Sequence, residues 1–498
     1  MNVNPITRLD YPDPDVIRVK DTYYMVSTTM HFMPGCEILQ SFDLVHWEHV
    51  TYVYETLDHT DAQQLKSGQN IYGQGMWAAS LRYHEGRFCI CFVANDTRKT
   101  YLYTSEKIDG PWKKQLIEGF YHDGSLLFDE DGRNYIVYGN DEIWITELNE
   151  DLTAPKKDGL HRLLVSDHKN PELGYEGSHI QKINGYYYIF LIHSLRDRWM
   201  RTEACFYSDS LEGEFTGGDV LCDDRGYCGQ GVAQGGIVDT PDGKWYAMLF
   251  QDSGAVGRIP ILLPVTWKDH FPFFGQNGHV PEEIEVHSTR PGYIYQPLVG
   301  SDDFCNGLLP RWQFNHDPDP RYYHLDALQG TYTITTREVC TELTQAVNTL
   351  TQRMSYPSCA AEVTVDASAL KEGDVAGLCA LQSCYAAVGI TKHHGKYEVL
   401  MLDKKEDGIL DMTEGTVVES HQMDFRLEAD FCNMKDEARC YYRVNKGDWL
   451  PIGTVHKLYF KLDHFTGCRF GLFCYAAEET GGSACFRDFK YYDVDEIS

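Results

Sequence analysis

The hydrophobic pattern of the first half of the chain repeats five times. Each repeat is an apolar strand, a tight turn and an aromatic-rich strand, and no helical periodicity competes between residues 1 and 296. Four of the turns contain a glycine, which readily adopts the positive φ that such turns require. The predicted hairpins span residues 16–26, 81–92, 126–138, 180–191 and 237–250.

The spacing of these hairpins predicts a β-propeller. With Asp21 and the turn residues Gly86, Gly132, Gly185 and Gly243 as markers, successive hairpins lie 65, 46, 53 and 58 residues apart. Such periods suit blades of four short strands joined by variable loops. We therefore expect a five-bladed β-propeller over residues 1–297.

After residue 297 the pattern changes. Short strands with period-two alternation, such as 331–335, 361–365 and 397–401, are separated by Gly and Asp turns. This is typical of an antiparallel β-sandwich, and roughly 200 residues suit one such domain. The predicted fold class is all-β, with the propeller followed by a β-sandwich over residues 298–498.

Charge and cysteine content narrow the range of possible partners, sites and compartments. Acidic residues exceed basic ones, 74 against 44, and a formal charge of −30 repels nucleic acid and anionic membranes. No apolar stretch reaches the roughly 18 residues of a membrane span, and the start lacks the pattern of a signal peptide. The 16 cysteines form no C-x-x-C pair, which argues against a zinc site and predicts buried free thiols. We therefore expect a cytoplasmic protein.

The start of each inner strand carries the candidate chemistry. Asp13, Trp77, Asp123, Glu176 and Gln234 each lie eight or nine residues before the turn marker of their hairpin. In a propeller, equivalent positions at these strand starts converge on the central axis. A single acid before a strand usually does no more than solvate a loop. Three acids at matching offsets, each beside Pro or Gly, indicate a functional site.

Three acids around a funnel suit either a divalent cation or acid–base chemistry. Calcium loops group their ligands closely in sequence, whereas these acids come one per blade. Facing acids suit hydrolysis of a glycosidic bond, in which one carboxylate activates water and an acid protonates the leaving oxygen. If the water sits between them, the two groups lie roughly 6.5–9.5 Å apart and the anomeric configuration inverts. A third acid can keep the pKa of the proton donor high by charge repulsion.

Several segments of the chain resemble glycoside hydrolase family 43. The matching segments are 11–14 (YPDP), 76–79 (MWAA), 122–125 (HDGS), 175–179 (YEGSH), 234–240 (QGGIVDT) and 257–258 (GR). The family consists of five-bladed propellers that act as inverting β-xylosidases, α-L-arabinofuranosidases and arabinanases. The resemblance implies that Asp13 is the general base, Asp123 the acid that modulates and orients, and Glu176 the general acid.

The resemblance also implies a sugar-binding set. Trp77 and Phe32 would line the sugar subsite, and Arg258 would contact the substrate as a charge-assisted donor. Gln234 would face the same subsite. Many members have a His near this position that helps to hold a central hydrated ion, and Gln offers only a neutral oxygen or amide. We therefore expect that no cofactor is required, and the sequence leaves open whether a Ca²⁺ ion binds.

The second half resembles the concanavalin-like domain attached to many family 43 xylosidases, at residues 312–316 and 348–353. It could be a separate carbohydrate-binding module or a lid that closes the propeller funnel. We favour the lid, because pockets at domain interfaces are common and the resembling domains act in this way. His393 and His394 look like a metal clip, but adjacent strand residues point to opposite faces, which favours a solvated turn.

The expected function is that of an exo-acting, inverting glycosidase that removes terminal xylose or arabinose from plant-derived oligosaccharides. An arabinanase is the alternative within the enzymes, and an open groove without a lid would suit it better. A non-catalytic glycan-binding propeller is the alternative from another class, and it would not need three matched acids. The sequence does not indicate whether xylose or arabinose is the preferred sugar. It also leaves open whether the protein forms a homo-oligomer.

Overall fold

The computed structural model describes residues 2–413 and 415–493, and nearly all of their regular structure is β-strand. Within these ranges the helices are four short 3₁₀ turns, and none of them is long and apolar enough to cross a membrane. The four turns are η1 (Lys66–Gly68), η2 (Gly254–Val256), η3 (Leu343–Gln345) and η4 (Cys432–Met434).

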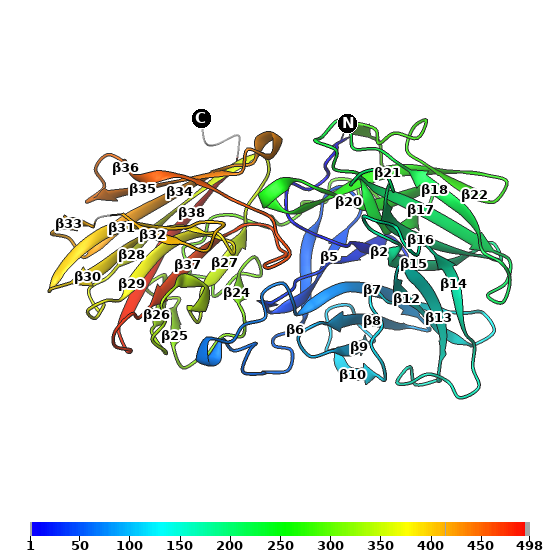
Figure 1. Ribbon diagram of the computed structural model, residues 1–498, viewed down its shortest axis with the longest axis horizontal. Helices are drawn as coiled ribbons and strands as arrows, with labels where there is room; N and C mark the ends of the chain where they lie inside the picture. Colours follow the sequence, from blue (N-terminus) through cyan, green and yellow to red (C-terminus); the bar gives the residue numbers. More distant parts are fainter. Residues whose placement is uncertain (1, 414, 494–498) are drawn as a thin grey trace.

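Five antiparallel four-stranded sheets form the propeller, which occupies the blue-to-green half of Figure 1. The five predicted hairpins are the first two strands of the five blades, so the predicted propeller is confirmed. The first two blades contain β2 (Asp15–Val19), β3 (Thr22–Val26), β5 (Gly35–Ser41) and β6 (Glu48–Tyr54), then β7 (Met76–His84), β8 (Arg87–Ala94), β9 (Lys99–Ser105) and β10 (Lys113–Ile117). The third contains β11 (Ser125–Phe128), β12 (Asn134–Asn140), β13 (Glu142–Leu148) and β14 (His161–Ser166). The last two contain β15 (Glu176–Ile183), β16 (Tyr186–Ser194), β17 (Arg201–Ser208) and β18 (Thr216–Leu221), then β19 (Ala233–Asp239), β20 (Trp245–Asp252), β21 (Arg258–Lys268) and β22 (Phe271–Phe274).

Polar contacts close the ring between the first and the last blade. Strand β1 (Asn2–Val3) pairs with β23 (Glu283–Ile284). The Asn4 amide then imitates a strand partner, since it donates to Leu262 O at 2.7 Å and accepts from Leu262 N at 3.1 Å. On the inner strands, Arg18 of β2 forms an ion pair with Asp239 of β19.

One side chain ties four blades together near the axis. Arg82 of β7 donates to Asp15 Oδ2 of the first blade at 2.7 Å, to Ser125 Oγ of the third at 2.7 Å and to Ile180 O of the fourth at 3.2 Å. The other oxygen of Asp15 lies 3.1 Å from His179 Nδ1. Buried charges persist where they are paired and hydrogen-bonded, as these are. The network fixes the inner strands relative to one another.

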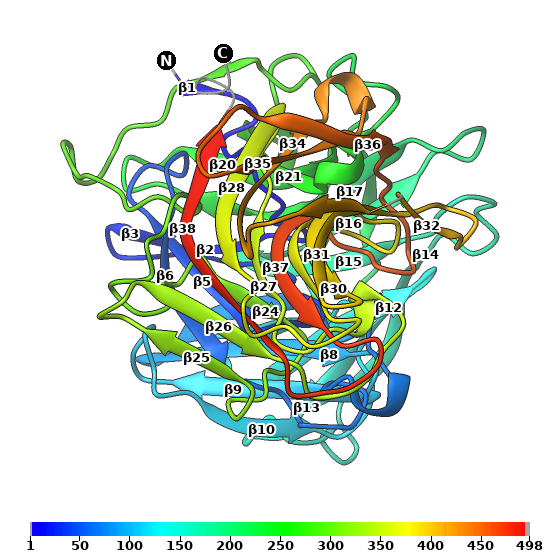
Figure 2. The same cartoon turned by 90° about the vertical axis from the view of Figure 1, so that its left-hand side faces the viewer.

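The second half is a sandwich of two antiparallel sheets, as predicted, and Figure 2 shows it in front of the propeller. One sheet contains β24 (Gln313–Asn315), β27 (Leu350–Arg353), β29 (Val375–Leu381), β30 (Ala386–His393), β31 (Lys396–Lys404), β32 (Leu410–Met412), β33 (Thr416–Val418) and β37 (Arg469–Tyr475). The other contains β25 (Tyr323–Asp326), β26 (Thr331–Thr335), β28 (Ser358–Asp366), β34 (Gln422–Asp430), β35 (Glu437–Val444), β36 (Leu450–Lys457) and β38 (Ser483–Asp493). Their facing apolar side chains form a single buried core. The predicted boundary after residue 297 falls in the segment between β23 and β24.

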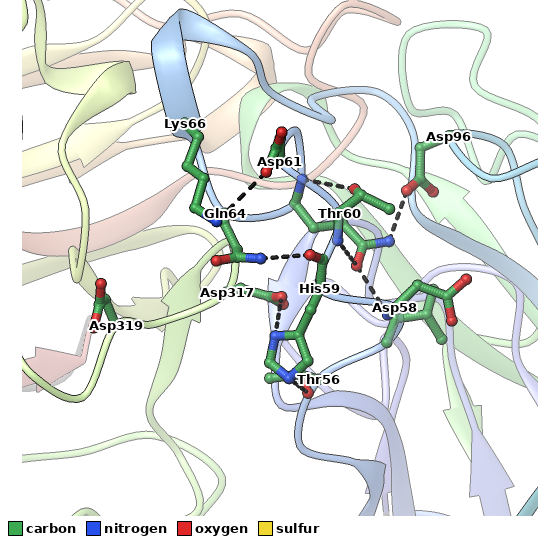
Figure 3. A network of polar contacts seen from close by, with 12 residues as sticks. Thr56, Asp58, His59, Thr60, Asp61, Gln64, Lys66, Asp96, Asp317 and Asp319 are labelled. Atoms are coloured by element: carbon green, nitrogen blue, oxygen red, sulfur yellow. Dashed lines mark hydrogen bonds and ion pairs between the residues drawn. The ribbon is translucent and has the colours of Figure 1, made fainter.

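The two halves share a sheet. Strand β4 (Phe32–Met33), which lies between blade strands β3 and β5 in the chain, pairs with β24 of the sandwich. A second junction lies beside it, where the loop after β6 meets the segment after β24 (Figure 3). There His59 Nδ1 lies 3.0 Å from the buried carboxylate of Asp317, and Asp317 N donates to Gln63 O at 2.9 Å. The sandwich is thus joined to the propeller by backbone pairing as well as by side chains.

Candidate active site

A cavity lies where the inner strands of the blades begin. Six of the seven predicted site residues line it, and Phe32 does not. The lining residues are Pro12, Asp13, Thr28, Met30, Trp77, Ala78, His122, Asp123, Glu176, Gln234, Arg258 and Phe465. The repeat therefore brings together residues that are far apart in sequence, as the matching offsets predicted.

The backbone at these strand starts is unusual. Asp13, Asp123 and Gln234 have φ of +53°, +47° and +63°, although none of them is glycine. Each such residue costs about 1–3 kcal/mol, and such strain gathers at functional sites. In the fourth blade Gly177 takes the left-handed conformation, with φ of +66°, and a Cβ there would lie 2.8 Å from the Gln234 side chain. The local backbone is thus built to turn these side chains into the cavity.

Hydrogen bonds hold the Asp13 carboxylate at both oxygens. Thr28 Oγ1 donates to Oδ2 at 2.6 Å, and Arg258 Nη1 donates to Oδ1 at 3.1 Å. The Arg258 guanidinium is itself fixed, because it lies 3.4 Å from Asp252 Oδ1 and against the rings of Phe250 and Phe465. Asp13 therefore has one orientation and a positive charge beside it.

Asp123 and Glu176 lie close to each other on neighbouring blades. Burial raises the pKa of Asp123 to about 6, and the charges of Glu176 and Asp13 add to the shift, while His122 and a hydrogen bond from Gly177 N oppose it. That bond, to Asp123 Oδ2, is 3.0 Å long. Asn140 Nδ2 donates to Glu176 Oε2 at 2.7 Å. The site thus combines a buried carboxyl of raised pKa with a second carboxyl that a neutral amide orients.

His122 lies between these two acids. Its Nε2 is 3.5 Å from Asp123 Oδ2 and 3.6 Å from Glu176 Oε2. The charge of Asp123 is the largest cause that raises the pKa of His122, to about 9, and Glu176 contributes further. The ring also meets Trp77 edge-on, with centroids 5.7 Å apart. His122 is therefore a cation at neutral pH.

The sandwich contributes one wall of the cavity. Phe465, in the loop between β36 and β37, lies 5.5 Å from the Trp77 ring and 4.4 Å from the Arg258 guanidinium. The loop is anchored to the propeller, because Asp10 accepts from Gly467 N at 2.8 Å and from Arg258 N at 2.7 Å. There is no room for a side chain at Gly467, whose Cβ would lie 2.2 Å from a backbone carbonyl. The cavity is thus completed across the domain junction.

Two protein-family models match the chain, one in each half. The model of glycosyl hydrolases family 43 matches residues 3–272, and the model of the β-xylosidase C-terminal concanavalin A-like domain matches residues 301–492. The chain belongs to glycoside hydrolase family 43. The resemblance of the chain to this family is therefore confirmed, and so is its assignment as a glycosidase.

Relatives of this family 43 chain cover both halves. A β-xylosidase of Formosa agariphila is 26% identical in an alignment that covers 99% of this chain and 89% of the relative. A non-reducing end α-L-arabinofuranosidase of Bacteroides ovatus is 24% identical and covers 82% of this chain and 79% of its own length. A solved structure from Bacteroides eggerthii, described as bifunctional GH43-CE, is 42% identical with a TM-score of 0.92. It covers all of this chain, which spans 64% of that protein.

The structure places Phe32 elsewhere. Its ring is fully buried in the shared sheet, beneath the Arg469 guanidinium at 3.4 Å, and does not reach the cavity. Met30, two residues earlier and with φ of +52°, lines the cavity in its place. Sequence reasoning missed this because strand β4 pairs with the sandwich and turns Phe32 into the junction. It also missed His122, although that residue adjoins Asp123, and Phe465, for which the sequence held no signal.

The donor set of this family 43 site does not suit calcium. His122, Asp123 and Glu176 offer ligand atoms within 4.8 Å of one another, the only such group of three in the described residues. Ca²⁺ prefers six to eight oxygen ligands, and an imidazole with two carboxylates does not resemble that shell. His393, the last residue of β30, and His394, in the turn that follows, are both exposed, which confirms the predicted solvated turn. Their ring centroids lie 4.0 Å apart, so the expectation that the two side chains point to opposite faces was wrong.

Proposed function

We propose that this family 43 enzyme is an exo-acting, inverting glycosidase that releases terminal xylose or arabinose from oligosaccharides. One observation carries the proposal. Asp13, Asp123 and Glu176 come from three blades to one cavity, which Phe465 of the sandwich closes on one side. A sugar-binding module would need the aromatic wall but not three acids held in three different environments.

The environments of the acids suggest how they divide the work. Asp13, held by Thr28 and Arg258, would take a proton from the attacking water. Glu176, oriented by Asn140, would protonate the glycosidic oxygen. Asp123 would be the third carboxyl, which the family resemblance assigns to modulating and orienting the proton donor.

Exo action rests on the wall that the sandwich supplies. Phe465 packs on Trp77 and Arg258, and Phe460 of the same loop lies 5.9 Å from Phe465. A cavity closed by such a loop has room for the end of a chain, whereas a cut inside a chain needs a groove that is open on both sides. The names of the two curated relatives, a β-xylosidase and a non-reducing end α-L-arabinofuranosidase, agree with this proposal.

The test is a panel of aryl β-D-xylopyranosides and aryl α-L-arabinofuranosides. We expect release of the phenol from at least one of them and only monosaccharide from oligosaccharides. Proton NMR of the first sugar formed should show the anomer opposite to that of the substrate. A ladder of oligosaccharide products would favour an arabinanase, and a retained anomer would refute the inverting mechanism.

We also propose that hydrolysis needs no cofactor and takes place in a reducing compartment, the cytoplasm. Protein groups can supply base, acid and modulating carboxyl, so a chelator should leave the rate unchanged. All sixteen cysteines are free and ten are buried, as suits a cell interior where thiols stay reduced. Fractionation of the producing cells, with detection by antibody, tests the compartment.

A further inference from the structure

His122 has no part in the mechanism above, although it lies between two of its acids. Its Nε2 is 3.5 Å from Asp123 Oδ2 and 3.6 Å from Glu176 Oε2. The same nitrogen is buried and has no hydrogen-bond partner among the residues that the structure describes. A small movement would therefore bring it into a hydrogen bond with either carboxylate. The edge-on contact with Trp77 holds the ring in this position.

The charges that face His122 come from three blades. Asp123 is its neighbour in the chain, Glu176 begins β15 and Asp13 precedes β2, and all three favour the protonated ring while burial opposes it. Glu176, in turn, accepts a hydrogen bond from the Asn140 amide, and both a carboxylate and a neutral carboxylic acid have an oxygen that can accept it. The group that must deliver a proton thus has a protonated imidazole as its neighbour.

We propose that His122 and Glu176 hold one proton between them, and that this proton is the one delivered to the glycosidic oxygen. The inference rests on the proposed function. When the sugar enters and displaces water, an imidazolium–carboxylate pair becomes less favourable than neutral imidazole and carboxylic acid, because charges cost more in a drier site.

The proton then balances through the cycle as follows. It moves from His122 Nε2 to the Glu176 carboxylate, and from there to the glycosidic oxygen as the bond to the anomeric carbon breaks. Water attacks that carbon and gives one proton to Asp13. Asp13 releases its proton to solvent and His122 takes one up, which restores the starting state. The net reaction is addition of one water across the glycosidic bond.

Leaving-group dependence separates this role from a structural one. His122→Asn is compared with the wild type on a phenyl and a 2,4-dinitrophenyl glycoside of the pentose that the panel selects. Phenolate departs poorly without a proton, whereas dinitrophenolate needs none. We expect kcat on the phenyl glycoside to fall about 10²-fold or more, and on the dinitrophenyl glycoside less than about threefold, with KM little changed. The basic limb of the kcat–pH profile should move to lower pH, because the imidazole whose pKa is raised to about 9 is then absent.

The matched control is His84→Asn. His84 belongs to the same blade as Trp77 but stacks on Phe128 away from the cavity, so both rates should stay at the wild-type level. His122→Gln replaces His122→Asn if the latter does not fold, as judged by melting temperature. Equal losses on both glycosides would overturn the inference while leaving the proposed function intact. A wild-type enzyme that cleaves no pentoside would overturn both.

Discussion

Three histidines and a tyrosine form a buried ring cluster at the domain junction, and it predicts a specific acid sensitivity. The ring of His31 contacts those of Tyr72, His316 and His464, and Tyr72 contacts both of the other histidines, with centroids 4.6 to 5.1 Å apart. All three imidazoles are fully or almost fully buried. His316 Nε2 accepts a hydrogen bond from Ile71 N at 3.0 Å, which only a neutral ring can do. Burial lowers the pKa of His316 and of His464 to about 3 and that of His31 well below its usual value.

The magnitude follows from the difference between the folded and unfolded pKa. The unfolded chain binds a proton on each ring below about pH 6.5, whereas the folded protein does not until about pH 3 for His316. Each ring therefore contributes its full stability above pH 6.5 and loses it progressively as the pH falls toward 3. At pH 5 the loss is about 2 kcal/mol per histidine, from about 1.4 kcal/mol per pH unit over about 1.5 units.

The assay compares wild type with His316→Gln, whose amide oxygen can still accept from Ile71 N. Carboxyls whose pKa burial raises to about 6, such as Asp374 and Asp436, respond to acid in the opposite direction but occur in both proteins, so only the difference is diagnostic. Between pH 7 and pH 5 the wild-type melting temperature should fall about 4–8 °C further than that of the variant. His287→Gln, at an exposed site, should behave as wild type. The same pH dependence in wild type and His316→Gln would refute the argument.

Three further predictions follow from single residues. Asp13→Asn and Glu176→Gln should each lower kcat on an aryl pentoside at least about 10³-fold. The melting temperature of each variant should stay within a few degrees of the wild-type value. Near-normal turnover by either variant would show that the replaced residue does not have its assigned role. Phe465→Ala should raise KM on oligosaccharides several-fold while the fold persists, because the cavity loses the wall that packs on Trp77. An unchanged KM would show that the loop does not hold the sugar. Burial raises the pKa of Glu203 well above its usual value, so the folded protein keeps a proton that the unfolded chain releases above about pH 4.5, and stability falls as the pH rises. Between pH 6 and pH 9 the melting temperature of Glu203→Gln should therefore fall less than that of the wild type. Equal falls would contradict the assignment of this pH dependence to Glu203.

The propeller and most of its cavity could be predicted from the sequence because their signals are local and repeated. Turn glycines such as Gly132 and Gly185 mark four of the five hairpins, and a fixed count back from the turn reaches Asp123 and Glu176. Symmetry then supplies the long-range contact that single segments do not contain. The prediction for Phe32 had no such support, because its position depends on the pairing of β4 with a strand nearly three hundred residues later. Phe465 could not be predicted for the same reason.

The junction and the cavity are mechanically linked through two pairs of neighbouring residues. Met30 and Phe465 line the cavity, while His31 and His464, next to them in the chain, belong to the buried ring cluster. Protonation that opens the cluster must therefore displace the cavity wall, and activity should fail in acid before the blades unfold. A bound sugar opposes this, since a ligand at about 100 times its Kd adds about 2.7 kcal/mol to the closed state, more than one histidine loses at pH 5. Incubation at pH 5 with and without saturating pentose, followed by assay at pH 7, measures this linkage. Equal inactivation in both would mean that the sugar and the junction act independently.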